Sequence, residues 1–590
     1  MKNYLFLFSI LPVQSFIFQA RKTKDLFSGS EILSSLIKFA MNEVNNGEII
    51  FPSKIGKSQP NRFLAKISMS SNSEVKKFGD ELESKVRQRF EDKILTGLNS
   101  NDILNKLPQN YKDQLNSFLQ VYWTAVEING NDYPQKYLEI EKRLAEIKNY
   151  RVFSQLMEKG RKCSVCGERN ALIYKAQNKS KWIKQSEHFT YRYFQKDAYE
   201  LKSNDESSVL LNENEGLCLI CAGKRFLPED ISKTYPSTAN IAIDDTLNKL
   251  TTPNNNALNL LGKFKSLLGK DFDFQLLYVE NLTKNYFIKQ GLEKHKEKIQ
   301  QLKDILTELE KYAKNQGLKF TPYYSIVMFD GDSMGQWLSG EFLRNKNDLM
   351  EFHRTLSTQL QKYAQSISLS SPKGSIVYAG GDDFLGFFNL NYLFTELDKL
   401  YNDFIENVSE QLKTFTDSIL TFSAGIVVAH YKMPLQAVLE ACKKQEKEAK
   451  SPQKNKNGFS LAVLKHSGEI NQTTFNWKYN GKSILHTFSD IISLLKTKKI
   501  STNFITTFQQ EFGDLINQKD PELLNLFEIE LSRLIERSIN KSYKGKEKKE
   551  ILDTATEKVL LLLKASNFDY KNFIQSLNTI RFLSTQLNEM

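Results

Sequence analysis

The sequence predicts an α+β protein with two ferredoxin-like domains, a metal-binding region between them and a helical C-terminal domain. First, a strand–helix–strand–strand–helix–strand order, the split βαβ pattern, occurs twice along the 590 residues. Second, two C-x-x-C pairs lie between the two copies. Third, only helical spacing follows Ser483. We therefore expect domains at residues 1–150, 151–243, 244–470 and 471–590.

The first copy begins with a nearly continuous apolar strand, Tyr4–Ile10, followed by a helix from Gln14 to Asn45. Two short strands, a polar helix and a last strand complete this copy: Gly47–Phe51, Arg62–Ile67, Ser73–Phe90 and Leu119–Ile128. Residues Met1–Ala20 also imitate a signal peptide, but Pro12 interrupts the apolar run, which favours a buried strand.

A helix from Tyr133 to Gly160 leads into the cysteine region, and a long helical stretch with interruptions runs from Asp244 to Gly317. The second copy then follows in the same order, with one more helix and strand: Tyr324–Asp330, Gly335–Ser366, Gly374–Ala379, Phe384–Phe388, Tyr392–Phe415, Leu420–Ala429, Leu435–Lys450 and Phe459–Leu464. The two copies share no clear sequence identity, so only the pattern is repeated.

Composition narrows the class of protein. Hydrophobic residues make up 40% of the chain, and 40 Phe with 24 Tyr can bury much apolar surface, which argues against a disordered chain. No run of 18 apolar residues is present, so we expect no transmembrane helix and no membrane partner. The formal charge of +12 suits an acidic partner such as RNA or nucleotides, although the basic run Lys541–Lys549 is interpreted as solvated surface.

The motif with the clearest chemistry is Gly380-Gly381-Asp382-Asp383, between two predicted strands. The glycines permit a tight hairpin and let a phosphate approach the backbone. Since the first and third strands of a split βαβ sheet are antiparallel neighbours, Asp330 should lie beside Asp382 and Asp383. Three carboxylates at one strand end suit one or two Mg²⁺ or Mn²⁺ ions. The alternative is a plain glycine-rich hairpin with solvated acids.

Four thiols form the second constellation. Cys163-x-x-Cys166 and Cys218-x-x-Cys221 are each a typical half of a structural zinc site, and an insertion must loop out between them. A redox pair or free thiols are the alternatives, but a redox motif would not usually occur twice. Few cysteines and no disulfide pattern indicate a reduced, cytoplasmic compartment. The remaining Cys442 is interpreted as packing within a helix.

Cationic and imidazole side chains give weaker signals. Four lysines lie on the helix that ends at Lys450, and most are interpreted as solvated, whereas Lys450 lies beside the sheet, where it can reach a triphosphate. None of the six His is followed by Asp or has the spacing of a zinc protease. Neither a nucleophile elbow nor a Walker loop is present.

Together these residues resemble the CRISPR polymerase, the large palm-domain subunit of type III CRISPR effector complexes, in its Cmr branch. The catalytic palm of that family is matched by Asp330-Gly331-Asp332-Ser333-Met334-Gly335 and by the Gly-Gly-Asp-Asp hairpin. Further matching segments are Pro12–Ile17, Ala20–Leu26, Pro60–Ala65, Tyr235–Ala239, Ser423–Ile426 and Glu446–Lys450. The resemblance extends from about Tyr4 to Leu464.

The resemblance implies an RNA-guided antiviral nucleotidyltransferase. Once guide RNA pairs with target RNA, such a subunit joins ATP into cyclic oligoadenylate second messengers, together with the other subunits of the complex. Its chemistry implies catalytic Asp330, Asp382 and Asp383, which also bind the metal. Nucleotide contacts are expected from Gly331, Asp332, Ser333, Gly380, Gly381, Lys447 and Lys450. The first palm carries no Gly-Gly-Asp-Asp and is expected to bind the acceptor or only to pack.

Several alternatives stay open. Some branches of the family attach AMP to S-adenosylmethionine, and the sequence does not choose between these acceptors. A catalytically silent scaffold would have no need for the three acids, and a stand-alone diguanylate cyclase has one palm rather than two. Many relatives begin with an HD nuclease domain, whereas this chain reaches its palm strand at Tyr4, so we expect no DNase of that type. The helical tail Ser483–Met590 is expected to bind a partner subunit or nucleic acid.

Overall fold

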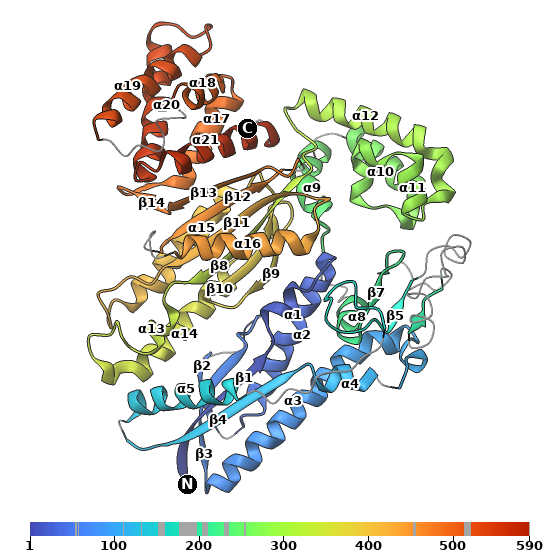
Figure 1. The fold of residues 1–590 in the computed structure, drawn as a ribbon, viewed down its shortest axis with the longest axis vertical. Coiled ribbons are helices and arrows are strands. Elements are labelled where there is room, and N and C mark those ends of the chain that lie inside the picture. The colour runs from blue at the N-terminus through green and yellow to red at the C-terminus, as the bar shows by residue number, and fades with distance from the viewer. Residues whose placement is uncertain are drawn as a thin grey trace.

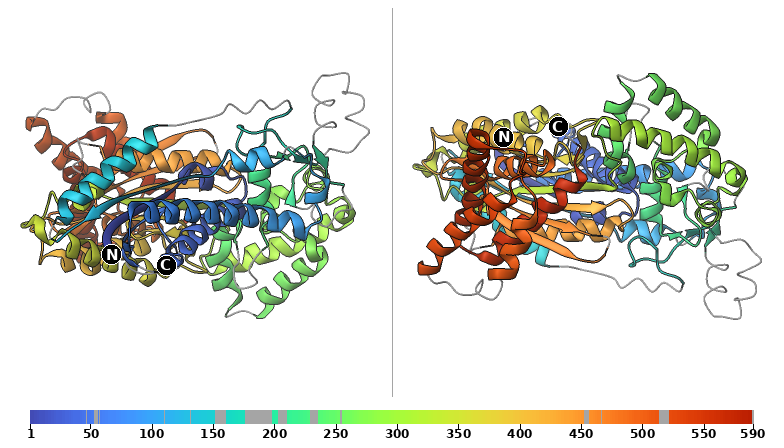
Figure 2. Two further views of the ribbon diagram at one scale, coloured as in Figure 1. Left: turned by 90° about the horizontal axis from the view of Figure 1, so that it is seen from below. Right: turned by 90° about the horizontal axis from the view of Figure 1, so that it is seen from above.

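The structure is a computed structural model in which three bodies follow one another along the long axis (Figure 1). The first palm is at one end, the second palm in the middle and the C-terminal helices at the other end, while the cysteine region and helices α10–α12 lie to one side (Figure 2). Residues that the structure describes are 1–45, 47–52, 56, 58–109, 111–130, 132–150, 160–175, 198–202, 210–228, 235–252, 255–451, 456–465, 467–512 and 521–588.

The first sheet has the strand order β2-β3-β1-β4 with antiparallel neighbours, as the split βαβ pattern predicts. Its strands are β1 (Lys2–Leu11), β2 (Gly47–Phe51), β3 (Arg62–Met69) and β4 (Gln120–Ile128). Phe6 and Phe8 of β1 lie in one core, and Leu5 and Leu7 lie in a second core that also contains residues of the second palm. Burial on both faces explains why the strand is apolar without alternation.

Helices in this half are α1 (Gln14–Phe18), α2 (Thr23–Asn42), α3 (Asn72–Ser100), α4 (Tyr111–Asn116) and α5 (Tyr133–Asn149). The predicted continuous helix from Gln14 to Asn45 is wrong, because the chain breaks between α1 and α2. There the carboxylate of Asp25 accepts hydrogen bonds from the backbone N–H groups of Arg21 and Lys22, at 3.0 and 3.1 Å, and so begins a new helix. Of the helix predicted to reach Gly160, residues 151–159 lie outside the described residues.

The second sheet has the order β13-β12-β11-β8-β10-β9. Its strands are β8 (Tyr323–Gly331), β9 (Gly374–Ala379), β10 (Asp383–Phe388), β11 (Phe422–His430), β12 (Gly458–Leu464) and β13 (Ile470–Asn476). The four strands β11-β8-β10-β9 repeat the topology of the first sheet. The sheet continues past residue 470, where we expected this palm to end, since β13 pairs with β12 along its whole length.

Four helices accompany this sheet: α13 (Met334–Leu338), α14 (Leu349–Ser366), α15 (Leu393–Phe404) and α16 (Leu435–Ala449). The helix predicted over Gly335–Ser366 is interrupted near Gly340, whose φ of +74° lies in the left-handed region that ends helices. Beyond α15 the chain continues as a π-helical turn over Ile405–Ser409 and a 3-10 turn over Glu410–Leu412, so the helical stretch ends three residues before the predicted Phe415. Helix α16 packs across the sheet beside β11 (Figure 1).

The remaining elements are short strands and helices. The cysteine region contains β5 (Ile173–Tyr174), β6 (Tyr199–Glu200), β7 (Gly216–Leu217) and α8 (Leu219–Phe226), and the approach to the second palm contains α9 (Thr238–Thr251), α10 (Asn255–Leu268), α11 (Lys284–Lys289) and α12 (Ile299–Asn315). After the hairpin β14 (Lys478–Tyr479) and β15 (Lys482–Ser483) come α17 (Ile484–Lys496), α18 (Asn503–Phe512), α19 (Pro521–Ser538), α20 (Gly545–Ala565) and α21 (Tyr570–Gln586). Within the described ranges, no helix has the length and apolar character that crossing a bilayer requires.

Candidate active site

The register of the second sheet places the predicted acids together. Strands β8 and β10 are antiparallel, and Asp330 is paired directly with Asp383. Asp382 immediately precedes β10, and its backbone carbonyl accepts a hydrogen bond of 2.9 Å from the N–H of Gly331. The first and third strands of this palm are therefore neighbours, as the sequence pattern predicted, and they meet at Asp330 and Asp383.

Both hairpin positions require glycine, Gly380 because a side chain would not fit and Gly381 because of its backbone conformation. A Cβ on Gly380 would lie 2.2 Å from Oδ1 of Asp383, so a side chain would displace that carboxylate. Gly381 has a φ of +117°, which L-residues rarely adopt. In the turn, the N–H of Gly380 donates to the carbonyl of Asp383 at 2.9 Å. This local geometry holds both acids at the tip of the hairpin.

Burial and mutual repulsion shape the electrostatics of these acids. Burial raises the pKa of Asp382 to about 6, and the charge of Asp330 adds to the increase. Burial also raises the pKa of Asp383 to about 8, with further increases from Asp382 and Asp330. Carboxylates that are this costly to ionise without a counter-ion are ready to bind a cation.

Lys450 neutralises part of the negative charge of the three acids through its ion pair with Asp330. Lys450, at the end of α16, donates to Oδ2 of Asp330 and also lies 3.0 Å from Glu446. The side-chain oxygen atoms of Asp330, Asp382 and Asp383 do not all lie within 4.8 Å of one another, which is the spacing that a shared metal ion would need. For one metal ion to contact all three carboxylates, the side chain of Asp330 would have to rotate away from Lys450. Carboxylate oxygens are the ligands that Mg²⁺ and Mn²⁺ prefer.

The other predicted nucleotide contacts differ in role. The carboxylate of Asp332 is buried and accepts hydrogen bonds from Thr421 and Ser423, both at 2.7 Å, and from the N–H of Asn457 at 3.0 Å. We interpret it as an anchor for the loop after β8 rather than as a ligand. Its neighbour Ser333 has a left-handed φ of +58° and accepts a hydrogen bond of 2.6 Å from Lys456, a cation that the sequence reasoning missed.

Lys447 is exposed on α16, one turn before Lys450. Gly331 has no room for a side chain, because a Cβ there would lie 2.8 Å from Met334. Gly331 therefore contributes only backbone beside the acids, and Lys447 lies on the exposed side of α16.

The first palm places one cation, Arg62, near the acids of the second palm. At the strand positions that correspond to Asp330 and Asp383, it carries Ser9 paired with Arg62. Arg62 forms an ion pair of 3.1 Å with Glu141, and its charge lowers the pKa of Asp382. Between the palms, a crevice beside Asp382 is lined by residues 51, 52, 56 and 58–60 of the first palm and by α14.

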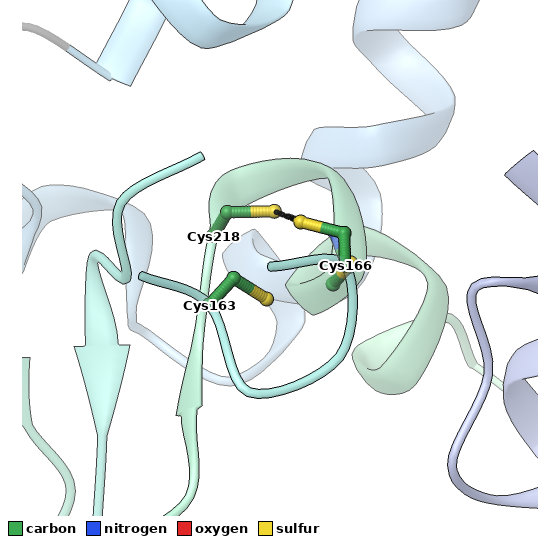
Figure 3. Close-up of side chains that lie close together, drawn as sticks. Cys163, Cys166 and Cys218 are labelled. Atoms are coloured by element: carbon green, nitrogen blue, oxygen red, sulfur yellow. Dashed lines mark hydrogen bonds between the residues drawn. The ribbon is translucent and has the colours of Figure 1, made fainter. Parts of the chain in front are cut away.

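The four predicted zinc ligands converge. The sulfur atoms of Cys163, Cys166, Cys218 and Cys221 lie within 4.8 Å of one another. Figure 3 shows three of these side chains, Cys163, Cys166 and Cys218, pointing toward one another. The Sγ atoms of Cys166 and Cys218 are 3.8 Å apart, which is about the edge of a tetrahedron with Zn–S bonds of about 2.3 Å. Four thiols leave no open position, so the chemistry of this donor set fits a closed, structural zinc ion.

A buried ionic cluster ties the cysteine region to the first palm. Arg225 of α8 contacts Asp25 of α2 with two hydrogen bonds of 2.5 and 2.7 Å, and its guanidinium also lies 3.3 Å from Glu215. All three side chains are almost fully buried. The Ala20–Leu26 segment, which sequence reasoning placed within the first palm, thus acts at least partly as a structural joint.

Comparisons with known proteins agree with this geometry. A family model described as "Cas10/Cmr2, second palm domain" matches residues 323–460, and one described as "CRISPR-associated protein Cmr2, N-terminal" matches residues 5–132. These two stretches, each of which contains one of the palms, match the Cas10/Cmr2 family. The stretch that matches the second palm contains the three acids and Lys450, and the resemblance to the Cmr branch is confirmed.

The chain is also similar to individual Cmr proteins. The protein "CRISPR system Cmr subunit Cmr2" of Pyrococcus furiosus is 23% identical in an alignment that covers 80% of this chain and 62% of that relative. The chain thus spans less than two thirds of the length of this curated relative.

Two solved structures have a similar fold. The first, "Type III-B Cmr-beta Cryo-EM structure of the Apo state", has a TM-score of 0.63 and 14% identity, over 93% of this chain and 78% of the other. Type III-B Cmr-beta bound to cognate target RNA gives a TM-score of 0.61 and 13% identity, over 93% and 80%. At these identities, the likeness shows a shared fold.

Proposed function

We propose that this chain is the catalytic large subunit of a type III CRISPR complex and that its second palm joins ATP into cyclic oligoadenylates. The observation that carries the proposal is the pairing of Asp330 with Asp383 on neighbouring strands, with Asp382 beside them. The partners proposed on this basis are the other subunits of the complex, guide RNA, target RNA and ATP.

Each residue of the site has a proposed part in the reaction. Asp330, Asp382 and Asp383 would hold Mg²⁺ or Mn²⁺, which supplies Lewis-acid stabilisation of the charge on the reacting phosphate. Gly380 and Gly381 let the triphosphate approach the backbone, and Lys450 exchanges Asp330 for a phosphate oxygen. Arg62 of the first palm faces the acceptor side, where its positive charge orients the second nucleotide.

The acceptor defines a second candidate. The same palm chemistry attaches AMP to S-adenosylmethionine if that molecule, rather than ATP, lies against the first palm. A catalytically silent scaffold is opposed by the buried acids, whose raised pKa values destabilise a protein that has no use for them.

The test uses the assembled complex with target RNA, labelled ATP and Mn²⁺, with and without S-adenosylmethionine. Asp382→Ala combined with Asp383→Ala should leave assembly and RNA binding intact and reduce product formation by about 100-fold or more. Replacing two exposed acids, Asp80→Ala with Asp113→Ala, provides the charge-matched control. Mass analysis of the products identifies the acceptor, and wild-type rates in the palm double variant would refute the proposal.

A further inference from the structure

A second cavity lies far from the palm acids, where the C-terminal helices meet the approach to β8. It has a volume of about 640 Å³, within the range of pockets that bind ligands. Four separate segments line it, namely Lys319 before β8, the α17–α18 connection from Leu495 to Thr502, the stretch from Arg537 to Lys541, and the end of α21 at Ser584 and Thr585.

The charged residues that line this cavity are all positive. Its five charged residues are all cations, and no Asp or Glu belongs to it among the residues that the structure describes: Lys319, Lys496, Lys498, Arg537 and Lys541. The hydroxyls of Ser501, Thr502 and Ser538 and the amide of Asn540 add further polar groups, whereas those of Ser584 and Thr585 already donate to carbonyls within α21. A lining made mostly of donors fits a ligand that carries many acceptors and negative charge.

Backbone contacts keep two walls of this cavity together. Ile500 and Ile539 form an isolated antiparallel bridge. On either side of it, the N–H of Ser501 donates to the carbonyl of Ser538 at 2.8 Å, and the N–H of Asn540 donates to the carbonyl of Lys499 at 2.9 Å. The third wall is also fixed, since Nζ of Lys319 donates to the carbonyl of Thr585 at 3.1 Å. The cations are therefore presented by a preformed scaffold.

Glu536, the acid next to Arg537 in sequence, does not neutralise this surface. Its carboxylate pairs with Lys548 at 2.7 Å on α20. Lys498, Arg537 and Lys541 are exposed at the cavity, so their charges are available to a ligand from solvent. The start of the basic run Lys541–Lys549, interpreted from sequence as solvated surface, thus contributes to a concave positive site.

We propose that this cavity, which we call the tail pocket, binds the phosphodiester backbone of single-stranded RNA. Phosphate oxygens are strong acceptors and attract clustered Lys and Arg irrespective of base sequence. No aromatic ring lines the pocket among the described residues, so recognition rests on the backbone rather than on stacked bases. Cations spread over four segments match a string of phosphates better than a single phosphate group.

The experiment measures the affinity of the purified full chain for a labelled RNA strand of about 12 nucleotides by fluorescence anisotropy. The test variant combines Lys498→Ala, Arg537→Ala and Lys541→Ala. A control with the same net charge combines Lys270→Ala, Lys549→Ala and Lys571→Ala, three exposed positions outside the pocket. A third variant, Lys498→Arg with Arg537→Lys and Lys541→Arg, keeps the charge.

For single-stranded RNA, the slope of log K against log salt concentration decreases in magnitude by about 0.7 for each phosphate contact that is lost. Losing three contacts should therefore reduce the slope by about 2. Between about 50 and 200 mM salt, the wild type should therefore lose about 20-fold more affinity than the alanine variant. The charge-matched control and the charge-keeping variant should behave as the wild type does.

Three outcomes would overturn the proposal. The first is that the wild type and the alanine variant have the same affinity and the same salt slope. The second is that the alanine variant and the charge-matched control lose affinity for RNA equally. The third is that the pocket binds ATP but not RNA. Because no catalytic step is measured, failure here leaves the proposed palm chemistry untouched.

Discussion

Metal binding by the palm acids should depend steeply on pH. The relevant groups have raised pKa values, about 6 for Asp382 and about 8 for Asp383. A proton on either carboxyl competes with the metal, so affinity rises as the pH rises through these values and becomes constant above them. Both carboxylates are ionised in about 0.5% of molecules at pH 6 and about half at pH 8, which predicts an increase in affinity of about 100-fold.

Electron paramagnetic resonance of Mn²⁺ measures this affinity directly on zinc-loaded protein. Asp383→Asn removes the group of higher pKa and should reduce the pH effect to about 2-fold, the part that belongs to Asp382. Asp80→Asn, at an exposed site on α3, should keep the full effect. An affinity in the wild type that is the same at pH 6 and pH 8 would refute the reasoning.

Three further changes test the other contacts. Cys166→Ser should abolish stoichiometric zinc in elemental analysis and lower the melting temperature, because a closed thiolate site contributes folding energy; full zinc content would contradict it. Arg225→Met removes the buried cation that two buried carboxylates share, leaving Glu215 only the longer contact with Arg21 of 3.9 Å, and should destabilise the fold by about 3–5 kcal/mol, measured by thermal unfolding against the exposed Arg89→Met. Lys450→Met should raise the KM for ATP with folding unchanged, whereas Lys444→Met on the same helix should have no effect.

Topology was predictable because hydrophobic periodicity and strand order are local properties of the sequence. The run Tyr4–Ile10 and strand β10, which follows the Gly-Gly-Asp-Asp hairpin, are apolar because both of their faces are buried, whereas β9 at the sheet edge is only partly buried. Helix breaks were harder to foresee. The start of α2 depends on the capping carboxylate of Asp25, which the buried Arg225 also holds.

Within the site, pairing of the acids followed from topology, but the partners of individual side chains did not. Asp332 stands beside Asp330 in sequence, yet three donors from β11 and its surroundings hold it inside the protein. Lys456 lies beyond α16, and only the folded chain brings it to Ser333. Contacts between residues that are distant in sequence have no periodic signal, so sequence reasoning misses them.

The two palms show how one topology came to carry two kinds of chemistry. At corresponding strand positions, the second palm pairs Asp330 with Asp383, and the first pairs Ser9 with Arg62. Lys148 adds a further cation, donating to Ser9 at 3.0 Å. Acids in both copies would repel one another across the interface, whereas the charge of Arg62 lowers the pKa of Asp382 and so favours its ionised form. One copy thus supplies carboxylates suited to binding cations and the other supplies cations suited to binding phosphates, which is the division that the proposed reaction between two nucleotides requires.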